Sequence, residues 1–306
     1  MTLQQMRCLL AVVDNQFSVS RAAAALFTTQ PGVSKMIRAF ESQIGLEIFV
    51  RAGNRLTGLT QSGHEAIALA RRVLRDVSTM SALSRDKATD VSGTLRVGTT
   101  YIHARYTLIP VVKRFFNAYP SVNLLLNQGT PQQILNWVVE GAIDIGLSTL
   151  PVQSPSGVTT LDAYQVERSL IVPLQHPLLK SRLLKIEQIA RYPLVTLDES
   201  FSSGWVVQRE FQRRGLTPRI AMRATDTNVI KAYVAAGMGV AVVPKLAVDP
   251  SIDVDIRTIS SDHIFPASMA MISLRSDHLL RTFGYDFIQM VAPRWTRKAI
   301  SDLAVP

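Results

Sequence analysis

Cysteine is nearly absent from this sequence, since Cys8 is the single one in 306 residues. A lone cysteine forms no intramolecular disulfide, which fits a reducing compartment such as the cytoplasm. The sequence also lacks a basic segment followed by an apolar stretch and a cleavage site, and it has no apolar run long enough to span a bilayer. We therefore expect a cytoplasmic protein that is neither exported nor inserted into a membrane.

Metal-binding and catalytic motifs are missing as well. The histidines have no zinc-ligand spacing, and the sequence contains neither a P-loop nor a G-x-S-x-G turn. The glycine-rich stretch "GMGVAVVP" lacks the preceding strand and the G-x-G-x-x-G spacing of a dinucleotide site. We expect no enzymatic activity, no metal and no cofactor.

Acidic residues are outnumbered: 23 of them stand against 33 lysines and arginines, which gives a net charge of +10. Such a field attracts polyanions, and nucleic acid is the first candidate. The excess is spread along the chain, so charge alone does not locate a binding face. Hydrophobic residues make up 47% of the sequence, enough for two or three domains with buried cores.

The first 60 residues predict three helices and a hairpin. Apolar residues at helical spacing open the chain, and Ser18 is a suitable N-cap for a second, alanine-rich helix. The polar "TTQ" and Pro31 then mark an elbow before a third helix, Gln30 to Ile44, whose apolar stripe leaves a polar face free. This pattern is typical of a helix-turn-helix whose third helix enters the DNA major groove.

A wing is predicted directly after this helix. In "FVRAGNRLTGLT", Gly53-Asn54 is a turn signal between two short extended runs, and arginines flank the tip. Either arginine taken alone is more simply a solvated surface charge, but the ordered set favours DNA. The expected DNA contacts are Thr28, Thr29, Gln30, Pro31, Ser34, Lys35, Arg38, Arg51 and Arg55.

Residues 62–85 predict one long helix with an apolar stripe that includes Leu69, Val73, Val77 and Met80. Such a helix pairs two copies of the chain and holds two recognition helices in a fixed relation. The alternative is that the stripe docks on its own chain. Residues 86–93 are polar without an apolar period, and we interpret them as a hinge.

Residues 94–306 alternate strand-like and helical segments, which indicates an α/β domain. The expected strands are "TLRVGTT", "VNLLLNQ", "IDIGLST", "RSLIVPL", "PLVTL", "RIAMRAT", "GVAVVP" and "ASMAMISL". We expect two halves, one from 94–164 with 267–306 and one from 165–266. A cleft between them at the strand ends would favour anions.

Several motifs resemble one known family. The segment "FSVSRAAAALFTTQPGVSKMIRAFESQIGLEIFVRAGNRLTGLTQSG" is similar to the winged helix-turn-helix of LysR-type transcriptional regulators. The segments "NQGTPQQI", "YPLVT", "GLTPRI" and "ATDTNVIKAYVAAGMGVAVVP" resemble the CysB-like branch. The resemblance implies the following order: a winged helix-turn-helix domain (1–61), a linker helix (62–85), a hinge (86–93) and a bilobed α/β effector domain like periplasmic binding proteins (94–306).

The same resemblance implies a homotetrameric cytoplasmic activator of sulfur-assimilation genes that senses acetylserine-type inducers or small anions such as sulfate. The chain departs from the branch pattern T-T-x-T-Q, because it has "TTYIH". The expected effector-binding residues are Thr99, Thr100, Ile102, His103, Thr149, Val166, Ser202 and Thr225. The departures favour an anion with an apolar substituent, such as an organosulfur compound, unless Ile102 turns inward as core packing. If His103 titrates near pH 6.5, anion binding strengthens from pH 8 to pH 6.

The sequence therefore predicts an α+β multidomain regulator of sulfur-metabolism promoters that binds double-stranded DNA and a small anionic effector. Two other functions remain open at this point. One is a solute-binding protein of a transport system, which shares the bilobed architecture. The other is an enzyme acting on a small anionic metabolite.

Overall fold

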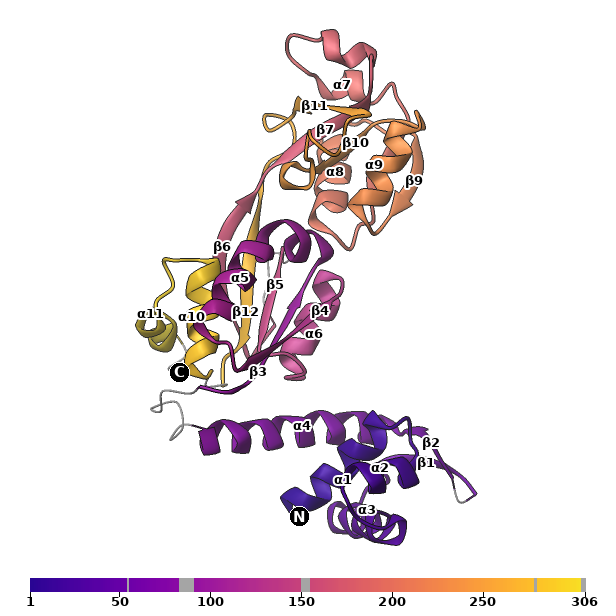
Figure 1. The fold of residues 1–306 in the computed structure, drawn as a ribbon. Coiled ribbons are helices and arrows are strands. Elements are labelled where there is room, and N and C mark those ends of the chain that lie inside the picture. The colour runs from indigo at the N-terminus through magenta and orange to yellow at the C-terminus, as the bar shows by residue number, and fades with distance from the viewer. Residues whose placement is uncertain (54, 83–90, 150–154, 278–279, 304–306) are drawn as a thin grey trace. The chain divides into compact units, whose positions relative to one another are not determined.

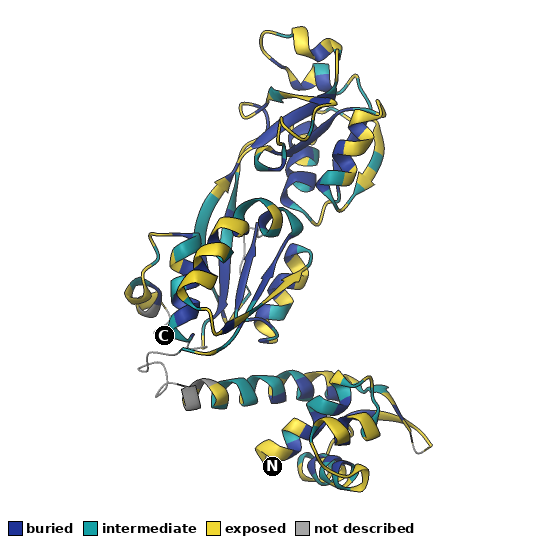
Figure 2. Cartoon of the chain, viewed as in Figure 1, coloured by how far each residue is buried: buried dark blue, intermediate teal, exposed yellow. Residues whose placement is uncertain are grey.

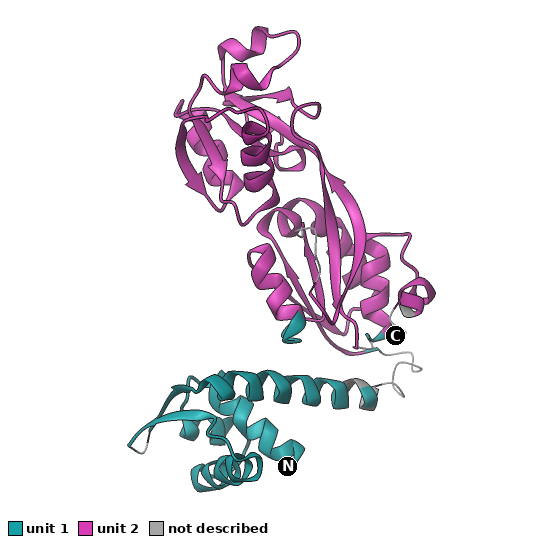
Figure 3. Ribbon diagram, turned by 180° about the vertical axis from the view of Figure 1, so that it is seen from behind, with its two compact units in different colours: residues 1–91, 139–142, 278–281 teal, residues 92–138, 143–277, 282–306 magenta. Residues whose placement is uncertain are grey.

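The structure is a computed structural model that describes all residues except 54, 83–90, 150–154, 278–279 and 304–306 (Figure 1). Contacts between Cα atoms divide the chain into two compact units (Figure 3). Unit 1 holds residues 1–91, 139–142 and 278–281, and unit 2 holds residues 92–138, 143–277 and 282–306. None of the helices in the described ranges combines the length and apolar composition that a bilayer-spanning segment needs.

The N-terminal part of unit 1 is a three-helix domain with a β-hairpin. Its elements are α1 (Leu3–Asp14), α2 (Val19–Ala25), α3 (Gln30–Ile44), β1 (Phe49–Ala52), β2 (Arg55–Leu59) and α4 (Gln61–Ala82). Side-chain oxygens of Thr2, Ser18 and Thr29 cap the first three helices by accepting backbone N–H groups. The predicted order of helices and hairpin is confirmed, as are the Ser18 cap and the limits of the third helix.

The apolar core of this domain includes two small residues of α2. Ala22 and Ala23 of α2 are buried, so the neighbouring helices approach closely. The core consists of Cys8, Leu9, Val12, Ala22, Ala23, Val33, Ile37, Phe40, Ile48, Phe49, Leu56 and Ile67. The apolar stripe of α3 is therefore used for packing, which leaves its polar face to solvent.

The long helix α4 has two different apolar faces. Ile67 and Ala70 are buried. The side chains of Leu69, Val73 and Met80 are 57%, 37% and 71% exposed. The structure thus describes the predicted long helix as far as Ala82, while residues 83–85 and most of the predicted hinge lie outside the described residues.

The first sheet of unit 2 has five strands in the order β4-β3-β5-β12-β6. Their bounds are Gly93–Thr99 (β3), Val122–Gln128 (β4), Ile145–Ser148 (β5), Val158–Val166 (β6) and Ser268–Arg275 (β12). β3 runs parallel to β4 and β5, while β12 runs antiparallel to β5 and β6. The helices of this half are the π-helix η2 (His103–Thr107), α5 (Leu108–Ala118), α6 (Pro131–Val139), α10 (Thr282–Val291) and α11 (Arg297–Leu303).

The second half of unit 2 carries its own sheet. Strands β10 (Ala241–Pro244), β7 (Arg168–Pro173) and β11 (Ile256–Ser260) pair in that order, and β8 (Leu194–Leu197) pairs with β9 (Ile220–Ala224). A bridge between Leu194 and Val240 connects the two groups. Its helices are η3 (Pro177–Lys180), α7 (Ile186–Ile189), α8 (Ser202–Gln212), α9 (Thr227–Ala235) and η4 (Lys245–Ala247). Figure 2 shows that buried residues gather on the strands of both sheets.

Two chain crossings connect the halves of unit 2. β6 ends at Val166 and β7 begins at Arg168, while β11 ends at Ser260 and β12 begins at Ser268 (Figure 1). β6 pairs with β12 as far as Val166, opposite Ser268. The limit between the halves that we predicted at residues 164 and 165 therefore falls inside β6.

Candidate functional site

The polar face of α3 is open to solvent and carries positive charge. Gln30, Lys35 and Arg38 are exposed, and Ser34 is half-buried. The Gln30 amide nitrogen donates to Ser34 Oγ at 3.3 Å, and Thr29 Oγ1 accepts from Gly32 N at 3.3 Å. Gln30, Pro31, Ser34, Lys35, Arg38 and Ala39 line a shallow hollow on this face. An amide and a hydroxyl flanked by cations can reach base edges and phosphates together.

Glu41 fixes the wing to α3. Its Oε1 atom accepts from Ile48 N at 2.9 Å and Phe49 N at 3.3 Å, and its Oε2 atom pairs with Arg51 at 2.7 Å. Arg51 is therefore partly neutralised by a carboxylate, whereas Arg55 is exposed at the start of β2. The sequence analysis did not single out Glu41, because its partners lie seven to ten residues further along the chain.

Predicted effector residues gather at the ends of β3 and β5. Thr99 is fully buried and donates from Oγ1 to Leu147 O at 2.9 Å, so its hydroxyl joins the two strands. Thr100 and Thr149 directly follow these strands and are also buried. Ser148 Oγ is buried and has no hydrogen-bond partner among the described atoms. Besides Thr99, whose hydroxyl is already bonded, Thr100, Ser148 and Thr149 thus carry hydroxyls at the ends of these two strands.

His103 is buried in η2 and bonded to Tyr164 of β6. Its Nδ1 atom lies 2.8 Å from the Tyr164 hydroxyl. Burial lowers the pKa of His103 to about 4 and raises the pKa of Tyr164 to about 12. The imidazole is neutral between pH 6 and pH 8, so the expected gain in anion binding through His103 over that range is wrong. Desolvation of the charged ring is the physical reason.

Arg168 is a buried cation that the sequence analysis did not single out. Its guanidinium donates to Pro266 O, to Ser268 Oγ at 2.6 Å and to Ser202 Oγ at 3.4 Å. Burial and, to a smaller extent, the nearby Arg209 lower its pKa to about 10, so it remains charged at neutral pH. None of the ion pairs within the described ranges involves Arg168, and its Nε atom is buried without a partner. The sequence signal that could have identified Arg168 is a charged residue at the start of the apolar run "RSLIVPL".

The other predicted effector residues differ in exposure. Val166 is buried at the end of β6, and Ser202 is buried as the first residue of α8. Ile102 is half-buried, and Thr225 is exposed between β9 and α9. His103 bonds to Tyr164, two residues before Val166 on β6, and Ser202 accepts from Arg168, two residues after Val166. No hydrogen bond among the described residues joins Thr225 to either pair.

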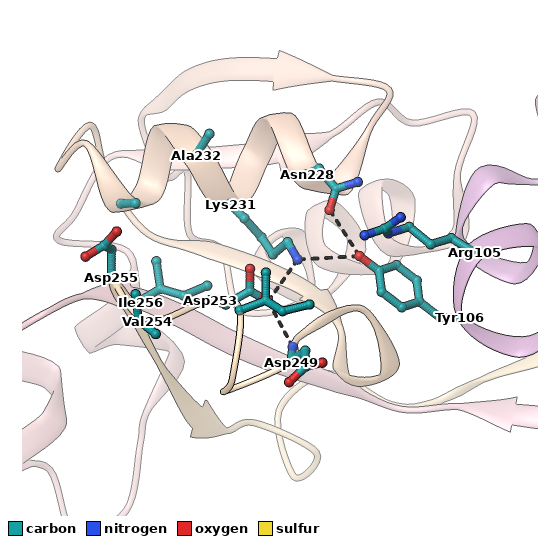
Figure 4. Close-up of a pocket in the computed structure, with 12 residues that line it drawn as sticks. Arg105, Tyr106, Asn228, Lys231, Ala232, Asp249, Asp253, Val254, Asp255 and Ile256 are labelled. Atoms are coloured by element: carbon teal, nitrogen blue, oxygen red, sulfur yellow. Dashed lines mark hydrogen bonds and ion pairs between the residues drawn. The ribbon is translucent and has the colours of Figure 1, made fainter.

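A mixed-charge pocket lies where η2 meets α9 and the segment after η4 (Figure 4). Tyr106 donates from its hydroxyl to Asn228 Oδ1 at 3.0 Å, and Asn228 Nδ2 donates to Tyr101 at 2.9 Å. Lys231 Nζ is 2.8 Å from Asp253 Oδ2 and 3.5 Å from the Tyr106 hydroxyl. No predicted effector residue lines this pocket. The contacts form a latch, Tyr101, Tyr106, Asn228 and Lys231, that joins the two halves of unit 2.

Two family models match this chain. One is described as "Bacterial regulatory helix-turn-helix protein, lysR family" and covers residues 3–64, and the other, "LysR substrate binding domain", covers residues 88–293. The chain belongs to the LysR family. This LysR-family protein is thus a DNA-binding transcriptional regulator with an effector-binding domain. The domain limits and contact residues predicted from the sequence stay predictions.

Individual relatives agree with this assignment. The regulator SsuR of Burkholderia cenocepacia is 36% identical over 303 residues, which are 99% of this chain and 98% of SsuR. The regulator CysB of the same organism is 33% identical over 300 residues, which are 98% of this chain and 96% of CysB. The solved cofactor-binding domain of the Cbl regulator is 30% identical, with a TM-score of 0.68 over 70% of this LysR-family chain and 94% of that one.

The latch predicts a measurable effect of one hydroxyl. Replacing Tyr106 by phenylalanine removes the donor to Asn228, and we expect the free energy of unfolding to fall by about 0.5 to 1.5 kcal/mol. Hydrogen exchange measured by mass spectrometry should speed up in η2 and at the start of α9. Tyr233→Phe, at an exposed position of α9, is the control. Equal exchange in the two variants would contradict the latch.

Proposed function

We propose that this LysR-family regulator is a cytoplasmic homotetramer without enzymatic activity that controls sulfur-metabolism promoters in response to a small anionic or organosulfur effector. The likeness to SsuR and CysB and the CysB-like motifs support the choice of genes. The effector site consists of Thr99, Thr100, Ile102, His103, Thr149, Val166 and Ser202, with Thr225 at its edge. Thr99 has a positioning role there, because its hydroxyl is already bonded to Leu147.

The buried guanidinium of Arg168 carries the proposal of an anion. A buried cation without a carboxylate is costly, and a bound anion lowers that cost. Ser202 touches Arg168 and begins α8, whose first backbone N–H groups favour negative charge. The apolar side chains of Ile102 and Val166 would then accommodate a carbon substituent on the anion.

The anion proposal places the pH dependence of binding at a higher pH than a titrating histidine would. Sulfate affinity should stay constant from pH 6 to pH 8, because His103 is neutral and Arg168 is charged throughout. Affinity should then fall as the pH approaches 10, because a growing fraction of Arg168 is neutral there and no longer attracts the anion. Calorimetry of the full chain with sulfate, thiosulfate and small sulfonates measures this.

Thr100→Val should weaken binding of these anions about tenfold, and Thr100→Ser should restore it. Wild-type affinity in Thr100→Val would place the site elsewhere.

We propose that α3 reads promoter DNA in the major groove, with Thr28, Thr29 and Pro31 at its start and Arg51 and Arg55 contacting the backbone from the wing. The exposed amide and hydroxyl of Gln30 and Ser34 would contact base edges. Lys35 and Arg38 would contact phosphates, which contribute affinity but little sequence information.

The DNA proposal separates two kinds of variant. With a duplex that the wild-type protein selects from random sequences, Gln30→Ala with Ser34→Ala should cost about 1 to 3 kcal/mol and relax specificity. Lys35→Ala should weaken binding to all sequences alike and reduce the slope of log affinity against log salt by about 1. Gln43→Ala, exposed near the other end of α3, is the control. Full affinity and specificity in the double variant would refute the assignment.

The exposed stripe of α4 supports self-association. Leu69 and Val73 lie exposed in the single chain, so a second copy of the helix can cover them. Aspartate at both positions would place unpaired charge in that interface, and we expect dissociation in analytical ultracentrifugation. Ser78→Asp, exposed on the same helix, should leave the oligomer intact. An unchanged sedimentation coefficient in the Leu69→Asp, Val73→Asp variant would count against pairing through α4.

A further inference from the structure

Phe27 combines two features that folding alone does not favour. Its side chain is 99% exposed, and its backbone is left-handed with φ of 51°. Within the described ranges, the other non-glycine residues with positive φ are Gln16, Phe17 and Gln175. Phe17 is half-buried and packs edge-on against Phe49 with ring centroids 6.4 Å apart. Phe27 is thus an aromatic residue in a strained conformation without compensating burial.

Two backbone hydrogen bonds define the elbow between α2 and α3 that carries Phe27. Its N–H donates to Ala24 O at 3.1 Å, and the N–H of Thr28 donates to Ala23 O at 2.9 Å. Glycine is the usual residue at such a helix end, because it has no side chain to strain. A bulky residue that persists in a sparsely populated conformation points to a function at that place.

The position of Phe27 connects it with the DNA-reading face. It lies three residues before Gln30, and Thr28, Thr29 and Gln30 that follow it are all exposed. A phenyl ring has no charge or hydrogen-bonding group for a phosphate. The carbon surfaces that a duplex offers to such a ring are the thymine methyl groups and the deoxyribose carbons.

We propose that Phe27 contacts DNA through one of these carbon surfaces and so positions the elbow at the start of α3. This proposal rests on α3 as the helix that reads DNA. The contact releases no counterions, so it adds affinity without changing the salt dependence. It also explains why the strained turn carries phenylalanine in place of glycine.

Phe27→Gly separates this role from a structural one. We expect about tenfold weaker binding to the selected duplex, an unchanged salt slope, and a midpoint of chemical unfolding that is equal or higher, because glycine relieves the positive φ. Phe17→Gly is the matched control: it has the same backbone conformation but loses a packed ring, so its unfolding midpoint should fall. Wild-type DNA affinity in Phe27→Gly, or an altered oligomer of the free variant in sedimentation, would overturn the proposal.

Uracil in place of thymine distinguishes the two carbon surfaces. If Phe27 meets a thymine methyl, the wild type loses affinity for the uracil duplex by a larger factor than Phe27→Gly does. If it meets deoxyribose, uracil affects both proteins equally while Phe27→Gly stays weaker on either duplex. The Gln30→Ala, Ser34→Ala variant tests the assignment of α3 as the DNA-reading helix. If this variant and Phe27→Gly both bind the selected duplex with wild-type affinity, that assignment fails. If only the Gln30→Ala, Ser34→Ala variant loses affinity, the proposal for Phe27 is wrong and the assignment of α3 stands.

Discussion

One buried guanidinium joins the two sheets of unit 2 at the point where the chain crosses between them. Arg168 begins β7 two residues after β6 ends, and its Nη atoms donate to Pro266 O, just before β12, and to the hydroxyl of Ser268, the first residue of β12. A single side chain therefore bonds both crossings. Its charge is buried without a carboxylate, and Nε has no described partner. A bound anion would lower this cost, so the residue that bonds the crossing is also the one on which the proposal of an anionic effector rests.

Unit 1 depends on one ionisable side chain in a similar way. Glu41 of α3 accepts two backbone N–H groups at the start of the hairpin and pairs with Arg51 on β1. The hairpin and α3 thereby share a fixed geometry before any DNA is present. Preorganised elements lose less conformational entropy on binding, so in the proposed DNA complex the carboxylate would favour affinity even though it reduces the net charge of the wing.

Local signals made α3 predictable from the sequence. Thr29 and Pro31 mark its start, and Gly45 ends it in the left-handed conformation, so both limits follow from neighbouring residues. β6 and β11 were not predicted, because their sequences, "VTTLDAYQV" and "IRTIS", mix polar and apolar residues. These segments form strands by pairing with distant ones, β6 with β12 and β11 with β7. The low pKa of His103 depends on burial beside Tyr164, 61 residues away, and no local pattern encodes it.

The π-helix η2 is the element on which the predicted ligand residues and the latch converge. Leu108 N donates to His103 O, five residues earlier, and this wide turn changes which side chains share a face. His103 meets Tyr164 of β6, while Tyr106 meets Asn228 of α9. In an ordinary α-helix the side chains of His103 and Tyr106, three positions apart, would lie on one face. Thr100 lies three residues before the start of η2, and its carbonyl accepts from Ala104 N at 3.1 Å. An anion held at Thr100 would therefore act on a turn that already touches both halves of unit 2.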